Sequence, residues 1–113
     1  MPGVVDRVLL AVEQIPAGSV ASYGTIGRIA GAGPRQVGTI MRLYGADVCW
    51  WRVTDREGDL VPLEKARTHW AAEGIVVKPN GRGCRMPDFA ADPIQLAGDY
   101  QEACRERGWD PDR

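Results

Sequence analysis

The feature that most constrains the fold is a glycine- and proline-containing segment that separates two short helical patterns. Ser22 is placed to cap a helix over residues 23–30, and Gly31-Ala32-Gly33 then ends that helix. Pro34 suits the start of a second helix, which extends over residues 35–43. Proline has no backbone N–H, and an N–H at the first position of a helix has no intrahelical partner to lose. Two short helices joined by a tight glycine-containing turn predict a helix-turn-helix, whose second helix meets DNA.

The rest of the chain predicts further helices and a little β-structure. Three more helices are predicted, over residues 4–15, 63–73 and from Asp92 or Pro93 to about Arg107. Short extended segments are predicted at residues 20–22, 48–53 and 75–77, with Leu60-Val61 pairing back as a wing. The tail, residues 108–113, is expected to fray. The expected fold class is mainly α with small β, in a single winged helix-turn-helix-like domain.

Length and composition are those of one small globular domain over residues 1–113. The chain is 44% hydrophobic and 26% charged, and no apolar run approaches the roughly 18 residues of a membrane span. The first fifteen residues do not resemble a signal peptide, so a cytoplasmic protein with no membrane partner is expected. The three cysteines lack C-x-x-C spacing and His69 is the single histidine. We therefore expect no disulfide framework, no metal and no cofactor.

The charges are divided unevenly along the chain. Residues 1–54 have a balance of +2 and residues 55–113 a balance of −3. Between Glu13 and Asp47 there is no acid, whereas Arg28, Arg35 and Arg42 lie in that stretch. Periodic arginines in an acid-free segment of a neutral protein indicate a local surface that faces an anion such as DNA. A solvated helix face, with its acids elsewhere in space, is the alternative.

Four segments stand out as motifs: Ala21-Ser22-Tyr23, Arg35-Gln36-Val37-Gly38-Thr39-Ile40-Met41-Arg42, Trp50-Trp51-Arg52-Val53 and Ala72-Glu73-Gly74. In this order they resemble motifs in the DNA-binding domain of the O6-alkylguanine-DNA alkyltransferases. The second segment is similar to the family's recognition helix, and the third to the end of its active-site Pro-Cys-His-Arg-Val. The resemblance spans about residues 4–77 and leaves residues 78–113 as a C-terminal extension.

Two tryptophans occupy the positions that carry the family's chemistry. Trp50 stands where the family has its nucleophilic cysteine, and Trp51 stands where it has the activating histidine. The resemblance implies that Glu73 matches the glutamate of the family's relay of cysteine, histidine, water and glutamate. An indole offers only an N–H donor and cannot accept an alkyl group by simple displacement. The chain therefore resembles the alkyltransferase-like proteins, which bind alkylated guanine without repairing it. The resemblance implies a non-enzyme with no catalytic residue, which flips the damaged base and flags the lesion for nucleotide excision repair.

The resemblance also assigns roles to residues. The implied DNA-binding residues are Ser22, Tyr23, Arg35, Gln36, Thr39 and Arg42, and the implied alkylguanine pocket consists of Tyr23, Met41, Trp50, Trp51, Arg52 and Val53. Arg35 would fill the vacated stack, and Trp50 would form a flat wall. The implied partners are nucleotide excision repair proteins and double-stranded DNA with alkylated guanine. The protein is expected to be a monomer. A shorter loop after Gly58 implies a wider pocket.

Two other functions remain open from the residues alone. Cys49 precedes the matching position by one residue, so an active alkyltransferase that uses this thiol is one alternative. A winged-helix transcription regulator is the other, because Arg35, Gln36 and Thr39 offer groups that read bases.

Overall fold

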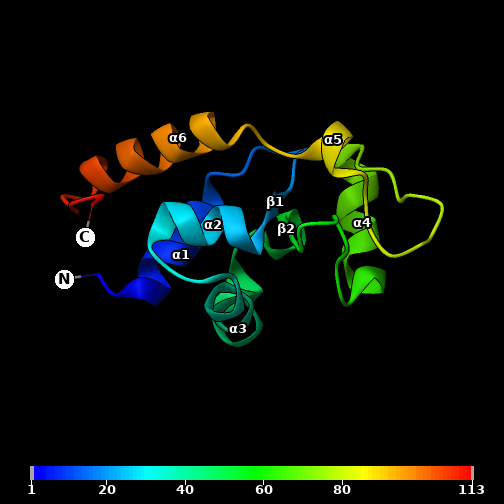
Figure 1. The fold of residues 1–113 in the computed structure, drawn as a ribbon, viewed down its shortest axis with the longest axis horizontal. Helices are drawn as coiled ribbons and strands as arrows, with labels where there is room; N and C mark the ends of the chain where they lie inside the picture. The colour runs from blue at the N-terminus through cyan, green and yellow to red at the C-terminus, as the bar shows by residue number, and fades with distance from the viewer. Residues whose placement is uncertain (1, 113) are drawn as a thin grey trace.

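Later elements of the chain surround helix α1. The structure is a computed structural model and describes residues 2–112. Its elements, with η for 3-10 helices, are α1 (Val4–Glu13), β1 (Ala21–Ser22), α2 (Tyr23–Ala30), α3 (Pro34–Tyr44), η1 (Gly45–Asp47), η2 (Trp50–Arg52), β2 (Val53–Thr54), α4 (Leu63–Glu73), α5 (Met86–Phe89) and α6 (Pro93–Glu106). The helices α3 and α6 lie on opposite sides of α1 and α2, and α4 lies at one end (Figure 1).

The helix-turn-helix forms as its capping and turn residues predict. The Ser22 Oγ accepts a hydrogen bond of 3.1 Å from the Thr25 N–H and thereby caps α2. Gly31 closes α2 with a φ of 83°, a left-handed conformation that favours glycine, and Pro34 begins α3. Inside α2, a Cβ on Gly27 would lie 2.2 Å from the carbonyl oxygen of Ala32. The turn between the two helices therefore requires glycine at position 27.

A two-stranded parallel sheet joins distant parts of the chain. Ala21 pairs with Val53 and Ser22 pairs with Thr54. This pairing holds the segment that contains Trp50 beside the first turn of α2, so residues that are far apart in sequence meet at one place.

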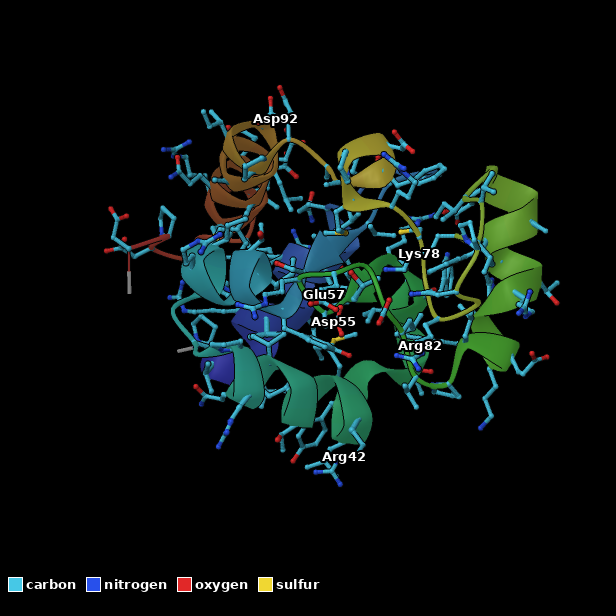
Figure 2. All side chains as sticks on the ribbon, turned by 45° about the vertical axis from the view of Figure 1, so that its right-hand side comes forward. Arg42, Asp55, Glu57, Lys78, Arg82 and Asp92 are labelled. Atoms are coloured by element: carbon cyan, nitrogen blue, oxygen red, sulfur yellow. The ribbon has the colours of Figure 1, made fainter. Side chains whose placement is uncertain are left out.

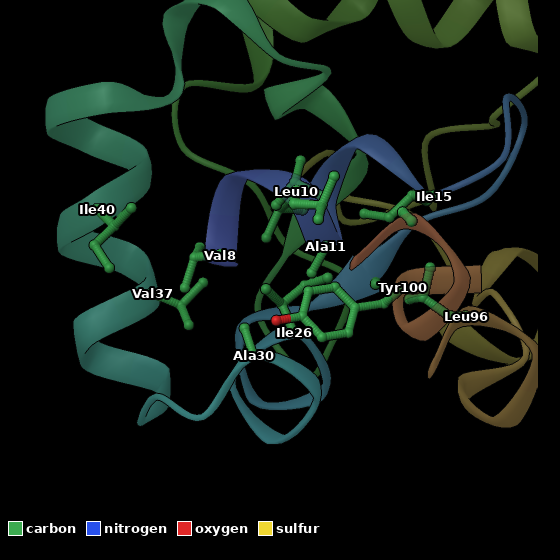
Figure 3. Packing of buried hydrophobic residues seen from close by; sticks show 14 of the residues in the cluster. Val8, Leu10, Ala11, Ile15, Ile26, Ala30, Val37, Ile40, Leu96 and Tyr100 are labelled. Atoms are coloured by element: carbon green, nitrogen blue, oxygen red, sulfur yellow. The ribbon is translucent and has the colours of Figure 1, made fainter. Parts of the chain in front are cut away.

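The main core lies between α1, α2, α3 and α6 (Figure 3). Val8, Ile26 and Val37 come from the first three helices, and α6 contributes Leu96 and Tyr100, each 1% exposed or less. A second, smaller cluster forms around Trp70 of α4 and is made of the residues Val20, Leu60, Ala66, Trp70, Ile75 and Cys84. Because α6 fills the main core, the C-terminal segment is an integral part of the domain.

The expected fold class, mainly α with a small sheet, is confirmed, and all five predicted helices form. Several predicted details of the β-structure are wrong. Trp50–Arg52 is a 3-10 turn, and residues 75–77 form no strand. The expected pairing of Leu60-Val61 is replaced by a hydrogen bond of 3.1 Å from the Leu60 N–H to the Arg82 carbonyl and by a bridge between Asp59 and Gly83. Local β-propensity does not supply a partner strand, and here the chain after α4 occupies the available edge.

The tail does not fray over its described part, residues 108–112. The buried Arg7 guanidinium donates to the Asp110 carbonyl at 2.7 Å, and Trp109 packs against the main core. Arg113, the end of the predicted frayed segment, lies outside the described residues. Within residues 2–112 every helix is too short or too polar to cross a membrane.

Candidate nucleic-acid interface

Helix α3 presents a polar, cationic outer face. Val37 and Ile40 fix the orientation of α3 because they are buried in the core, which leaves Arg35, Thr39 and Arg42 exposed on the other side. Within residues 2–112, neither Arg35 nor Arg42 forms a salt bridge. Arg42 extends from α3 away from the body of the molecule (Figure 2). Unpaired, exposed guanidinium groups on one helix face are suited to contact with a phosphate backbone.

A pocket of about 620 Å³ opens beside this face. Its walls come from α2, α3, the segment between α3 and β2, and the segment that leads into α4. The lining residues are Tyr23, Gly38, Met41, Arg42, Gly45, Ala46, Trp50, Val53, Leu60, Val61, Pro62 and Lys65. Most of these side chains are apolar, and the volume lies within the range of about 300–1,000 Å³ that is typical of ligand sites. The pocket therefore joins an apolar cavity to a cationic helix face.

Trp50 is the largest flat side chain in the pocket wall. Its ring meets Trp51 edge-to-face, with centroids 5.9 Å apart and an interplanar angle of 87°. It meets the ring of His69 in the same way, at 5.9 Å and 81°. Across the pocket, burial and then the nearby charge of Asp55 raise the pKa of Tyr23, so its hydroxyl keeps its proton. Trp50 is thus held by neighbouring rings and still borders the cavity.

Trp51 and Arg52 turn away from the pocket, toward Glu73. The Glu73 carboxylate accepts four hydrogen bonds, from Trp51 Nε1 at 2.8 Å, Arg52 Nε at 2.9 Å, Arg52 Nη2 at 2.7 Å and the Gly18 N–H at 2.9 Å. These donors, Arg52 first, lower the pKa of Glu73 to about 2. Burial works against this shift but does not outweigh it. The carboxylate is therefore saturated by structural donors.

The predicted pocket set divides in two. Tyr23, Met41, Trp50 and Val53 line one cavity, whereas Trp51 and Arg52 do not border it. The physical reason is the 3-10 turn of η2, which points Trp51 and Arg52 to the Glu73 side. Trp51 also stacks on His69, with centroids 3.7 Å apart and nearly parallel planes. His69 is consequently half-buried, although its position on the helix suggests a surface residue.

Of the predicted DNA-binding set, Tyr23 and Arg42 line the pocket, and all but Ser22 and Tyr23 lie on α3. Arg35, Gln36, Thr39 and Arg42 are exposed on that helix. The Thr39 hydroxyl donates to the Arg35 carbonyl at 3.1 Å. Ser22 uses its side chain to cap α2, as described above.

Sequence reasoning missed the part of the pocket wall that follows β2. Leu60, Val61, Pro62 and Lys65 line the pocket. Their place in the wall depends on how the loop after Gly58 leads into α4, which no local sequence pattern specifies. Gly45 also lines the pocket and was not predicted. A Cβ at this position would lie 2.9 Å from Met41 Cε, so a larger residue would displace the Met41 side chain from the pocket wall.

Cys49, the alternative nucleophile, does not line the pocket. Its thiol donates to the Val12 carbonyl at 3.2 Å, and its side chain packs against the main core. Burial raises the pKa of this thiol by more than the nearby Arg52 lowers it. A half-buried thiol that keeps its proton is a poor nucleophile.

A larger hollow of about 810 Å³ lies between α2 and α6. Arg28, Ile29, Ile94 and Tyr100 are among the residues that line it, and it contains none of the pocket residues predicted from sequence. We therefore place the candidate site at the smaller pocket, where the cationic face of α3 and Trp50 meet.

The arrangement of α2, α3 and the adjoining pocket defines a helix-turn-helix DNA-binding domain. Residues 4–75 match the family described as "6-O-methylguanine DNA methyltransferase, DNA binding domain". The chain belongs to this family, and within it to the alkyltransferase-like proteins. Two curated relatives, each named DNA base-flipping protein, come from Escherichia coli (strain K12) and Shigella flexneri. Each is 33% identical over 85 residues, which cover 68% of this chain and 66% of the relative.

Two solved structures share the fold over most of the chain. One is S. pombe Atl1 in complex with damaged DNA that contains O6-carboxymethylguanine, with a TM-score of 0.70 and 26% identity. The other is S. pombe ATL in complex with DNA, with a TM-score of 0.67 and 27% identity. Each match covers 82% of this chain and 100% of the other.

Proposed function

We propose that this protein binds duplex DNA that carries an O6-alkylguanine, turns the damaged base into the pocket beside α3, and leaves the alkyl group in place. One observation carries the proposal most directly. The pocket opens next to the cationic face of α3, and its wall contains Trp50 at the position of the family's nucleophilic cysteine. The relatives named DNA base-flipping protein, and Atl1 with its damaged DNA, are consistent with it.

The energetics of base flipping match the residues that surround the pocket. Extrusion of a base costs a few kcal/mol, and less for a base that pairs poorly, which favours a damaged guanine over a normal one. Stacking of the extruded base on Trp50 returns about 1–3 kcal/mol. Arg35, at the start of α3, fills the vacated stack, and Tyr23 pushes the flanking phosphate. Arg42 holds a backbone phosphate.

The same residues argue against alkyl transfer. Trp50 offers no thiolate, and the Cys49 thiol is turned toward the Val12 carbonyl. The Glu73 carboxylate already accepts four hydrogen bonds and has a pKa of about 2, so it is a poor proton acceptor for a relay. A protein without transfer chemistry must pass the lesion to other proteins. We therefore propose that the monomeric complex flags the lesion for nucleotide excision repair.

Incubation with a duplex that contains O6-methylguanine, with tritium in the methyl group, tests this function. We expect the label to stay on the DNA, and we expect tighter binding to this duplex than to the same duplex with guanine. Label on the protein would instead support an alkyltransferase that uses Cys49, and Cys49→Ser would then abolish the transfer. Equal affinity for both duplexes would support a transcription regulator.

Replacement of Trp50 by cysteine tests the loss of the relay. We expect Trp50→Cys to transfer no alkyl group efficiently, because Trp51 takes the place of the activating histidine and Glu73 is held by Arg52. Efficient transfer by Trp50→Cys would show that the relay is not needed and would contradict this reasoning.

The proposed repair role has its own test. A reconstituted nucleotide excision reaction on an O6-methylguanine duplex should make incisions faster when the protein is added. The Arg35→Ala variant, which we expect to bind the lesion poorly, should give less acceleration. An unchanged incision rate with the wild-type protein would contradict the flagging role while leaving lesion binding intact.

A further inference from the structure

The charged residues of the pocket are all of one sign. Of its lining residues, Arg42 and Lys65 are cationic and none is acidic. The remaining walls are largely apolar, with Trp50, Val53 and Leu60 among them. An apolar cavity with cations at its border attracts a ligand that combines a flat apolar body with a negative charge.

Lys65 is the cation that is free to meet such a ligand. Its side chain is exposed, and within residues 2–112 its ammonium makes no hydrogen bond or salt bridge. It lies in the first turn of α4, where the helix dipole disfavours a cation, so helix stability does not explain a lysine there. Arg42, in contrast, extends away from the body of the molecule, which suits a backbone phosphate (Figure 2).

The acids near this site are engaged elsewhere. Glu64, the neighbour of Lys65 in α4, pairs with Arg67 at 3.1 Å. Asp55 accepts hydrogen bonds of 2.9 Å from the backbone N–H groups of Glu57 and Asp59, so its Oδ1 is directed to its own loop. The positive charge of Lys65 is therefore not cancelled by a direct partner.

We propose that Lys65 makes the pocket selective for O6-substituents that carry a negative charge, such as carboxymethyl, over neutral substituents of the same size. This inference rests on the proposed function, because it concerns the base that enters that pocket. The ammonium pairs with the carboxylate of the adduct while the guanine ring stacks on Trp50. The flexible four-carbon stem of lysine allows the ammonium to follow the adduct.

Two duplexes that differ only in adduct charge test the proposal. One carries O6-carboxymethylguanine, and the other carries its neutral amide, O6-carbamoylmethylguanine. We expect the wild-type protein to bind the carboxymethyl duplex about fivefold more tightly at low salt, since a partly exposed ion pair contributes a modest energy. The preference should shrink as salt rises. In Lys65→Met the ratio should fall to about one, because the carboxymethyl duplex should lose more affinity than the amide duplex.

A charge reversal and a matched control sharpen the comparison. Lys65→Glu should invert the preference, so that the amide duplex binds more tightly. Arg105→Met removes one exposed positive charge on α6, outside the pocket lining, and should leave the wild-type ratio intact. Circular dichroism of each variant, compared with the wild type, verifies that the fold is retained.

The possible failures are distinguishable. If the wild-type protein shows no preference for the carboxymethyl duplex, the proposed selectivity is overturned. It is also overturned if Lys65→Met weakens binding to both duplexes equally, which would indicate that Lys65 binds a backbone phosphate. If the protein binds neither adduct more tightly than guanine, the proposed function itself fails.

Discussion

Glu73 shows how a change at one position alters the role of its neighbours. The residue matches a family glutamate that belongs to a proton relay, but here it holds Trp51, Arg52 and the turn at Gly18 together. With Trp51 in place of the histidine, an indole N–H donates directly to the carboxylate at 2.8 Å. Glu73 therefore holds Trp51 and Arg52 in place, next to the Trp50 that lines the pocket.

We expect Glu73→Gln to destabilise the protein at neutral pH by about 2 kcal/mol, because an amide cannot replace a carboxylate opposite Arg52. The folded-state pKa of Glu73, about 2, lies below its ordinary value of 4.5. Ionised Glu73 therefore contributes stability above about pH 4.5, and this contribution is lost as the pH falls toward 2. Urea unfolding of both proteins between pH 7 and pH 3 should show a difference that narrows below pH 4.5.

A matched control for this change is Glu64→Gln. Glu64 pairs with Arg67 on the exposed face of α4, with 87% of its side chain accessible. Removal of this pair should change stability little at any pH. A difference between wild type and Glu73→Gln that stays constant down to pH 3 would contradict the assigned pKa.

The two arginines of α3 should respond differently to truncation. Arg35→Ala removes the group that we propose to fill the vacated stack, so it should weaken binding to O6-methylguanine duplex more than binding to undamaged duplex. Arg42→Ala removes a proposed phosphate contact, so it should weaken binding to both duplexes equally and reduce the slope of log affinity against log salt by about one. Fluorescence anisotropy over a salt series measures both effects. An equal loss on both duplexes for Arg35→Ala would refute its assigned role.

At the scale of elements, the sequence predicts the helices and the extended segment that contains β1, but it does not predict how the strands pair. The signals for helix boundaries are local: Ser22 caps α2, Gly74 ends α4 with a φ of 78°, and Pro93 begins α6. A strand instead needs a partner, and local sequence does not identify one. The partner of Ala21–Ser22 is Val53–Thr54, more than thirty residues away.

The same limit explains which pocket residues were predictable. Tyr23, Met41 and Trp50 lie in segments that matched the family motifs, and these segments meet in the structure. The contribution of Lys65 depends on how the loop after Gly58 leads into α4, which no local pattern specifies. Trp51 was assigned by position in a motif, but the 3-10 turn decides where its ring points.

Gly27→Ala should show that the helix-turn-helix depends on close backbone contact. The added methyl group would lie 2.2 Å from the Ala32 carbonyl oxygen, so the turn must move, at a cost of about 1–3 kcal/mol. Gly98→Ala, in α6, meets nothing within 4 Å and should raise stability by about 0.5–1 kcal/mol. Urea midpoints compare the two variants. A Gly27→Ala protein as stable as the wild type would contradict the close contact.

At the scale of the whole molecule, charge and packing divide the domain into two sides. Residues 14–46 contain three arginines and no acid, whereas residues 88–112 contain seven acids and two arginines. Arg42 and Asp92 lie on opposite sides of the molecule (Figure 2). The side of α3 therefore attracts DNA, and the side of α6 is repelled by it. We therefore expect a duplex to bind on the α3 side.

The C-terminal helix is nevertheless essential to the fold. Leu96 is 1% exposed and packs against the residues of α1 and α2, so Leu96→Ala should lower the free energy of unfolding by about 2–5 kcal/mol. Ile94→Ala, on the same helix but 83% exposed, should change it by less than about 0.5 kcal/mol. A loss below about 1 kcal/mol for Leu96→Ala would mean that α6 is a dispensable addition to the domain.

The most direct test of the account is the affinity ratio between O6-methylguanine and guanine duplexes, measured for the wild type and for Trp50→Ala. We expect the wild-type protein to prefer the damaged duplex and Trp50→Ala to lose about 5- to 150-fold of that preference while it stays folded, because one stacking partner has been removed. Trp109→Ala, which removes an indole outside the pocket lining, should keep the wild-type ratio. A ratio near one for the wild type, or an unchanged ratio in Trp50→Ala, would contradict the account.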